Sequence, residues 1–284
     1  ADTPELRAAY GAMLPKVTAF FASLGQNLAL YERYKEIKAS AEFLTLSPEQ
    51  QKVIDNSLRD FRLGGAELPD SQKPRFAAIQ DEQATLAKAF SDHVLDATDS
   101  FVHLVTNQVD LTGLPDDVIA AAAHTAKQKG LEGWAFTLHF PSYYPVQQYA
   151  QNRSLRRLLY EAYVTRASEL APQYCNGKID WDNTQIMIEQ LRLRDEEARM
   201  LGFDNYAALS LAPKMARAVG EVDAFLTDFA KRAKPFAKKD WDELQAFAHT
   251  LGLVDGIEPW DMAFVSERLK QERYAFSENE LKQY

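Results

Sequence analysis

The sequence predicts an all-α fold, a mostly helical array with one small β element near residues 108–111 and 134–140. Apolar residues recur at steps of three and four along most of the chain, which is the period of one helix face. Serine and glycine signals mark where several of these helices begin and end. One stretch alternates at period two, which is the pattern of a strand.

The first helical pattern is an apolar stripe near the N-terminus. Its members are Leu6, Tyr10, Met13, Val17, Phe20, Leu24, Leu28, Tyr31 and Tyr34. Steps of three and four place them on one side of a long helix. Pro15 interrupts the stripe and is expected to kink the helix or to mark a restart, because proline lacks the amide hydrogen that a helix interior uses.

The second helix is predicted from its caps. Ser47 is the N-cap candidate, Pro48 takes the first helical position, and Gln50 completes a capping box. Gly64–Gly65 supplies the stop. A third, longer helix is predicted over residues 74–105, where apolar residues keep the same spacing.

The β element is predicted from residues 134–140, where large apolar side chains alternate with smaller or polar ones. This pattern indicates a strand, which Pro141 and Pro145 would close. Because the backbone groups of a strand need partners, the short run at residues 108–111 is the best neighbour in the sequence. Two strands alone are marginal, so we expect further partners from outside this chain.

The remaining helices are predicted at residues 154–170, 183–201, 205–211 and 261–273, with a long pair broken at Pro235. Near the end, Ser277 and Glu280 form another capping box, yet the sequence stops at Tyr284. A domain rarely ends just after a helix begins. We therefore expect the sequence to be part of a longer protein.

Composition and charge exclude several classes of protein. The chain is 46% hydrophobic and 26% charged, as in an average globular domain, and no run of 18 apolar residues predicts a membrane span. With a formal net charge of −9, it does not suit a nucleic-acid or anionic-membrane partner. The single cysteine, Cys175, and the lack of a signal-peptide pattern predict a cytoplasmic location.

The motif search finds no catalytic constellation. None of the five histidines is followed by glutamate, so the sequence lacks HExxH, and one cysteine cannot form a thiolate zinc site. Glycine-rich phosphate loops and the G-x-S-x-G elbow are also missing from the sequence. We therefore assign no catalytic residue and no metal ligand.

Two charged groups favour structural interpretations. His93, Asp96 and His103 share one predicted helical face, but the helix rise separates the two histidines by about 15 Å, too far for one ion. Consecutive helical residues diverge by about 100°, so the carboxylates of Asp195–Glu197 are expected to form a solvated, salt-bridged surface with nearby arginines.

Three residues are candidates for contact with a substrate: His139, Tyr143 and Tyr144. His139 lies on the smaller-residue face of the predicted strand, and the two phenols follow in a proline-bounded turn. The alternative for His139 is an exposed strand histidine with no role. The candidates depend only on this strand and on the two aromatic hydroxyls that follow it.

Several stretches, in order along the chain, match a known family pattern. They are LRRLLYEAYVTRAS at 155–168, WDNT at 181–184, LGFDNYA at 201–207, SLAPKMA at 210–216 and PWD at 259–261, with looser matches at 91–98 and 136–143. These stretches resemble the thimet-oligopeptidase family of zinc metallopeptidases, in particular its bacterial oligopeptidase A branch.

The resemblance implies a helical protein with a deep, narrow channel that admits short peptides and rejects folded proteins. In that family an HExxH helix and a downstream glutamate bind zinc, and the motif glutamate acts as general base. None of these elements has a matching position here. Zinc is therefore implied for the full-length member, with no ligands in this chain, and residues 1–284 would be the helical N-terminal portion without the catalytic portion.

Two hypotheses follow. In the first, the chain supplies scaffold and channel wall for a zinc oligopeptidase. It is then inactive in isolation and needs the missing C-terminal catalytic half, from the same or a second chain. In the second, it is a stand-alone helical peptide-binding or scaffold protein without catalysis. The C-terminus discriminates between them, because a stand-alone module should end in a capped, polar helix.

Overall fold

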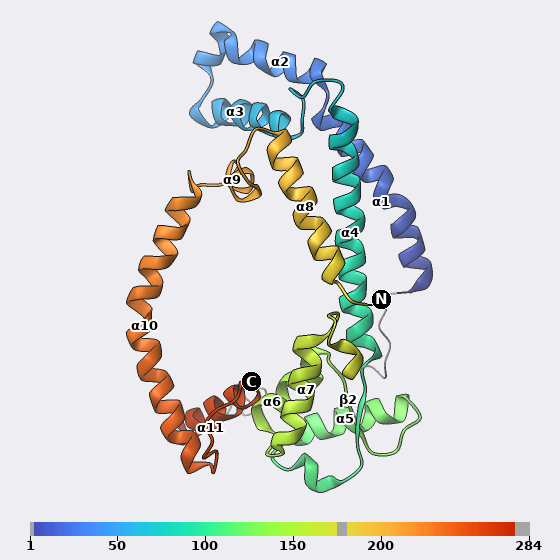
Figure 1. The fold of residues 1–284 in the computed structure, drawn as a ribbon, viewed down its shortest axis with the longest axis vertical. Helices are drawn as coiled ribbons and strands as arrows, with labels where there is room; N and C mark the ends of the chain where they lie inside the picture. Colours follow the sequence, from blue (N-terminus) through green and yellow to red (C-terminus); the bar gives the residue numbers. More distant parts are fainter. Residues whose placement is uncertain (1–2, 175–180, 276–284) are drawn as a thin grey trace. The chain divides into compact units, whose positions relative to one another are not determined.

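The fold is an array of helices with one small sheet (Figure 1). The computed structural model describes residues 3–174 and 181–275. The α-helices in these ranges are α1 (Pro4–Gly25), α2 (Leu28–Ala39), α3 (Pro48–Leu63), α4 (Lys73–Ser100), α5 (Asp116–Gln128), α6 (Phe140–Tyr149), α7 (Arg153–Thr165), α8 (Thr184–Met200), α9 (Tyr206–Leu211), α10 (Val219–Thr250) and α11 (Met262–Tyr274). The prediction of a mostly helical chain with one small β element is confirmed.

The chain forms two compact units, each built from two separate stretches of sequence. Unit 1 contains residues 1–91 and 185–228, and unit 2 contains residues 92–184 and 229–284. The chain therefore passes between the units within α4, at the start of α8 and within α10. The two units are described separately below.

Unit 1 begins with two helices where one long stripe was predicted. Thr3 caps α1, which continues through Pro15 and ends at Gly25, and Asn27 caps α2. The break therefore falls at residues 26–27 and not at the proline. Most of the apolar stripe on α1 is exposed: Leu6, Tyr10, Met13, Val17, Phe20, Phe21 and Leu24 have 41 to 63% of their surface accessible.

Helix α3 begins as its sequence predicts. The Ser47 hydroxyl accepts from the Gln50 amide, and the Gln50 side chain accepts from the Ser47 amide, so the capping box is confirmed. The aromatic ring of Phe61 on α3 packs against Tyr31 and Tyr34 of α2, with centroid distances of 5.8 and 5.6 Å. These ring contacts help to hold the two helices together. The ribbons of α2 and α3 lie side by side in Figure 1.

The ends of α1 and α3 meet backbone to backbone. A Cβ atom built on Gly64 would lie 2.9 Å from the Cα of Gly25, closer than side-chain carbons pack. Glycine at both positions therefore permits the contact. Elsewhere in unit 1, Arg75 of α4 forms a bidentate ion pair with Glu196 of α8, and Gln83 donates to Glu197 at 2.9 Å.

The small sheet belongs to unit 2 and corrects part of the prediction. Strand β1 (His103–Val105) pairs antiparallel with β2 (Trp134–Phe136), and His103 lies opposite Phe136. Residues 108–111, predicted as the partner strand, form the 3-10 helix η2 (Gln108–Leu111), because the Asn107 side chain caps the Val109 amide. The predicted helix over 74–105 accordingly ends at Ser100, and the predicted strand over 134–140 ends at Phe136.

Both clusters of buried apolar side chains found in the described residues lie in unit 2. The larger joins the sheet to helices α5, α6 and α7 through Phe101, Val105, Leu111, Leu114, Val118, Ala122, Phe136, Leu138, Tyr143, Val146, Tyr149, Ala150, Leu155, Leu159 and Ala162. The smaller lies between α10 and α11, around Ala248, Phe264 and Val265. The larger cluster provides the rigid support for the region around α6.

Some predictions concern residues that the structure does not describe. The capping box at Ser277 and Glu280 and the single cysteine, Cys175, lie outside the described ranges. Within those ranges, no helix is both long enough and apolar enough to cross a bilayer.

Candidate functional site

The start of α6 carries the three residues that the sequence singled out. The Thr137 amide donates to the Ser142 hydroxyl at 3.0 Å, which closes the short loop between β2 and α6. His139 is the N-cap residue, so it is not part of a strand. Its Nε2 atom lies 2.9 Å from Oδ1 of Asp99, and both side chains are about half exposed.

Tyr143 lies in the core of unit 2, with 7% of its surface exposed. Its ring stacks on Tyr163 at a centroid distance of 4.1 Å and an angle of 6°. The Arg166 guanidinium covers the Tyr163 ring at 3.8 Å. Burial raises the pKa of the Tyr143 hydroxyl to about 12, so the phenol stays protonated at neutral pH. Tyr143 thus offers little surface to a ligand and mainly supports its neighbours.

The exposed aromatic surface at the start of α6 belongs to Phe140, and the neighbouring Tyr144 is half-buried against the core of unit 2. Their rings stack at 4.8 Å with an angle of 13°, and Phe140 is 58% exposed. His139 therefore adjoins an exposed aromatic ring and an acidic partner, Asp99. The sequence-based candidates missed Phe140, whose place was misread because residues 134–140 appeared to form one strand.

A buried ion-pair cluster in unit 2 was not predicted. Asp261 is fully buried and accepts from Arg156 at 2.6 Å and from Arg153 at 2.6 Å. The Arg156 guanidinium, itself 1% exposed, also donates to the carbonyl of Ala150 at 2.6 Å and lies over the Phe264 ring at 4.2 Å. The cluster joins α7 to the start of α11.

The buried position would by itself raise the pKa of the Asp261 carboxyl. The hydrogen bonds from Arg153 and Arg156 outweigh that effect and hold the pKa below its usual range. Asp261 therefore carries a negative charge at neutral pH. Beside the cluster is a cavity of about 440 Å³ whose lining includes Leu251, Leu253 and Arg268.

The residues considered as metal ligands do not converge. Nδ1 of His93 lies 2.9 Å from the Asn183 side-chain oxygen, whereas His103 is in β1, where burial lowers the pKa of its imidazole. In residues 3–174 and 181–275, no group of three or more histidine, cysteine, aspartate or glutamate residues could hold a metal ion. The described side chains therefore do not fit a zinc centre.

The three adjacent carboxylates on α8 each contact different side chains, as the sequence predicted for a salt-bridged surface. Asp195 pairs with Arg199 at 2.8 Å, and Glu197 accepts from Gln83. Glu196 accepts from Arg192 of its own helix and from Arg75 of α4. Because each carboxylate faces a separate partner, the three do not form one acidic site.

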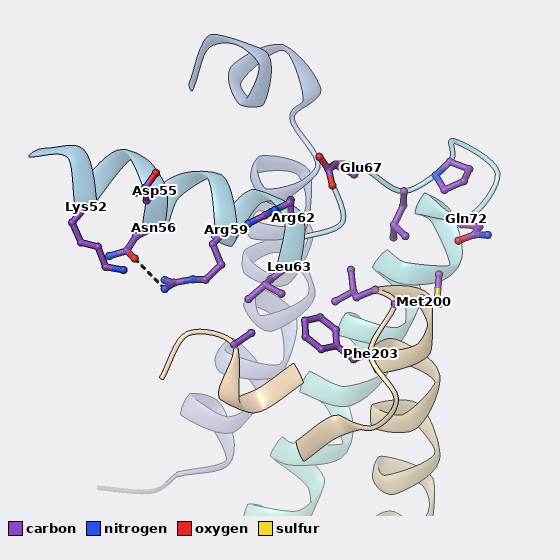
Figure 2. Close-up of a pocket in the computed structure, with 15 residues that line it drawn as sticks. Lys52, Asp55, Asn56, Arg59, Arg62, Leu63, Glu67, Gln72, Met200 and Phe203 are labelled. Carbon is purple, nitrogen blue, oxygen red and sulfur yellow. Dashed lines mark hydrogen bonds between the residues drawn. The ribbon is translucent and has the colours of Figure 1, made fainter. Parts of the chain in front are cut away.

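A larger cavity, of about 790 Å³, lies within unit 1 (Figure 2). Helix α3 provides one wall, and the end of α8 with the segment that follows it provides the apolar residues Met200, Leu201 and Phe203. No candidate predicted from the sequence lies in this cavity. Its existence depends on two segments almost 150 residues apart, so local patterns could not reveal it.

Comparison with known proteins places the chain in a family of peptidases. Residues 146–284 match the model of peptidase family M3, and residues 1–73 match the model of the neurolysin/thimet oligopeptidase N-terminal domain. The chain belongs to this family, as the resemblance of its motifs predicted.

Individual relatives make the assignment more specific. Over its whole length the chain is 43% identical to oligopeptidase A of Escherichia coli and 37% identical to probable cytosolic oligopeptidase A of Arabidopsis thaliana. Over 91% of its length it is 28% identical to a dipeptidyl carboxypeptidase of Escherichia coli. The chain spans about two fifths of the length of these relatives, 37 to 41%.

Proposed function

We propose that the chain forms the scaffold and part of the substrate channel of a zinc metallo-oligopeptidase that hydrolyses short peptides. The observation that carries the proposal is the 43% identity to an oligopeptidase A along the entire chain. Similarity that extends over both units supports a shared arrangement of helices, because one conserved motif alone would not require the rest of the fold to match.

The proposal assigns the chemistry to residues outside this chain. The sequence has no HExxH, and the described residues include no group of side chains that could hold zinc. The zinc ligands and the general base would come from a C-terminal catalytic half, in the same or a second chain. Residues 1–284 would then be the helical N-terminal portion, whose own role is to admit flexible peptides and exclude folded proteins.

Within this chain, we place substrate contacts at the start of α6. His139 and Tyr144 are the candidates with accessible surface, and the exposed Phe140 ring extends the same patch. An imidazole and two aromatic rings can bind peptide side chains by stacking and by hydrogen bonds. The buried Tyr143 would hold this patch in position through its stack on Tyr163.

The expected partners are short peptides and the catalytic half, with no nucleic acid and no membrane. The formal net charge of −9 supports this, because an acidic surface repels phosphate. One relative is described as probably cytosolic, and a single cysteine fits a reducing compartment. We therefore propose a cytoplasmic location.

Complementation tests the proposal. The purified chain would be assayed with a quenched fluorescent peptide and Zn²⁺, alone and with the separately produced remainder of Escherichia coli oligopeptidase A. We expect no cleavage by the chain alone and cleavage when both parts are present. Stoichiometric zinc and cleavage with the chain alone would refute the proposal. Peptide binding without complementation would support the alternative, a stand-alone helical peptide-binding or scaffold protein.

Variants refine the assignment to α6. With both parts present, Tyr144→Ala should raise KM several-fold, because an aromatic contact with the peptide is lost. Tyr10→Ala is the matched control, since Tyr10 is an exposed tyrosine on α1 in the other unit. Equal kinetics for the two variants would contradict a substrate contact at Tyr144.

A further inference from the structure

The cavity in unit 1 has a polar wall formed by one face of α3. Lys52, Asn56, Arg59 and Leu63 recur at steps of three and four, so their side chains point the same way. Figure 2 shows Lys52, Asn56 and Arg59 along this helix, with Arg62 and Leu63 at its end. The wall is therefore rich in positive charge.

The two carboxylates that line the cavity are already engaged elsewhere. Asp55 pairs with Lys38 at 2.7 Å, and Glu67 accepts a hydrogen bond from the Tyr31 hydroxyl at 2.5 Å. Burial and this hydrogen bond to Glu67 raise the pKa of the Tyr31 phenol to about 12, which keeps it protonated as the donor. Neither carboxylate is fully available to the cations of the wall.

The cations divide into one that is paired and two that are not. Arg59 donates to Asp60 at 2.9 Å and to Asn56 at 3.0 Å. Lys52 and Arg62 are exposed, and neither forms an ion pair or a side-chain hydrogen bond with the described parts of the chain. These two side chains provide free charge and free donors at the cavity.

Opposite the cations, the cavity has an apolar wall. Gly202, with φ of +80°, ends α8, and the Phe203 amide then donates to the Ala198 carbonyl at 2.8 Å. This turn places Phe203 beside Met200 and Leu63 at the cavity (Figure 2). A ligand there would meet an apolar surface next to two unpaired cations.

We propose that this cavity binds acidic peptide segments. Lys52 and Arg62 are ten positions apart on α3, about 15 Å of helix rise, so two separate carboxylates of the peptide would pair with them, one with each cation. An apolar side chain between the two carboxylates would pack against Leu63, Met200 and Phe203. A cavity of about 790 Å³ lies in the size range of ligand sites. The inference requires no catalytic residue, so it stands independently of the peptidase proposal.

Fluorescence anisotropy with labelled hexapeptides on the full 284-residue chain tests this inference. The probe would be acetylated, amidated at its C-terminus, and would carry an internal Glu-Leu-Glu. Its matched comparison would replace both glutamates with glutamine. We expect saturable binding of the acidic peptide, at least tenfold weaker binding of the glutamine peptide, and weakening as salt is raised.

Variants locate the binding. Arg62→Gln combined with Lys52→Gln should weaken binding of the acidic probe roughly tenfold. Lys16→Gln, which removes one positive charge from exposed α1 in the same unit, is the control and should leave binding of the acidic probe unchanged. A third peptide, with glutamines inside and a free C-terminus, shows whether a terminal carboxylate serves as well as a side-chain one.

Three results would overturn the inference: no saturable binding of any carboxylate-bearing peptide, equal affinity for the acidic and the glutamine probe with blocked termini, or equal loss in the Lys16 control. None of these measurements involves cleavage. A failure of the peptide site is therefore distinguishable from a failure of the complementation assay.

Discussion

Helices α1 and α7 carry apolar residues at the same spacing, but their surroundings differ. On α7, Leu155, Leu159 and Ala162 are 0 to 4% exposed and belong to the main core of unit 2. On α1, the corresponding stripe in unit 1 keeps 41 to 63% of its residues' surface accessible. A helical period therefore identifies which face is apolar, whereas burial of that face depends on whether another element packs on it.

Polar contacts accentuate the difference between the units. The α7 face is joined to α11 by the buried Arg156–Asp261 pair, which also satisfies backbone carbonyl groups. The ion pairs of unit 1, such as Arg199 with Asp195, are largely exposed. Buried pairs become costly when one partner is lost, while exposed pairs contribute little. The two units should therefore respond very differently to equivalent substitutions.

The largest expected effect is at Asp261. Asp261→Asn leaves two arginines without their buried counter-charge and should destabilise unit 2 by about 3–5 kcal/mol. Urea unfolding followed by circular dichroism measures the change. The control is Asp195→Asn, which removes an exposed pair and should cost less than about 1 kcal/mol. Equal losses for the two variants would remove the distinction between the units.

Next in size is the loss of a buried side chain from α7. Leu159 is fully buried, so Leu159→Ala should cost about 2–5 kcal/mol through lost burial and the cavity left behind. Phe20→Ala removes a larger side chain from α1, but Phe20 is 62% exposed, so the change should stay within about 0.5 kcal/mol. If Phe20→Ala lowered the melting temperature as much as Leu159→Ala, the apolar stripe on α1 would have to be covered by another surface in solution.

Acid should act on the same buried pair. The folded-state pKa of Asp261 is lowered, so its ionised carboxylate contributes to the free energy of unfolding. That contribution is fully present above the pKa of an aspartate in the unfolded chain, about 4, and it is lost as the pH falls through the folded-state pKa. Unit 2 should therefore lose stability below about pH 4. Asp261→Asn should flatten this dependence. A variant with the same acid profile as the parent chain would contradict the assignment.

The smallest predicted effect concerns a cap in unit 1. Ser47→Ala removes the acceptor for the Gln50 amide at the start of α3 and should cost about 1 kcal/mol. Ser47→Asp preserves the acceptor and should restore most of that stability. Thermal unfolding of the two variants separates the role of the cap from general effects of substitution at this position.

Local features of the fold were predictable from the sequence. The capping box at Ser47 and Gln50 appeared as expected, because capping depends on residues within one turn. The β element was placed near the right residues, but its partner strand was wrong. Residues 103–105 had continued the apolar spacing of α4, and nothing local showed that the helix ends at Ser100.

The candidate sites were harder to predict, because they depend on contacts between distant residues. Asp261 lies in one of the family-like motifs, but nothing local showed that it pairs with Arg156, which is 105 positions away. Tyr143 and Tyr144 are neighbours in the sequence, yet one is buried and the other reaches the surface patch with Phe140. That division depends on the orientation of α6 on the core. Periodicity within a ten-residue helix containing two prolines does not determine it.

The interrupted order of the two units has a consequence for protein synthesis. Arg156 leaves the ribosome 105 residues before Asp261, and the intervening chain includes all of the second stretch of unit 1. At typical elongation rates, roughly 5 to 20 s pass between the synthesis of Arg156 and that of Asp261. During that interval unit 2 can be compact but cannot close its buried pair, so nascent chains paused within α10 would be particularly exposed to chaperones and proteases.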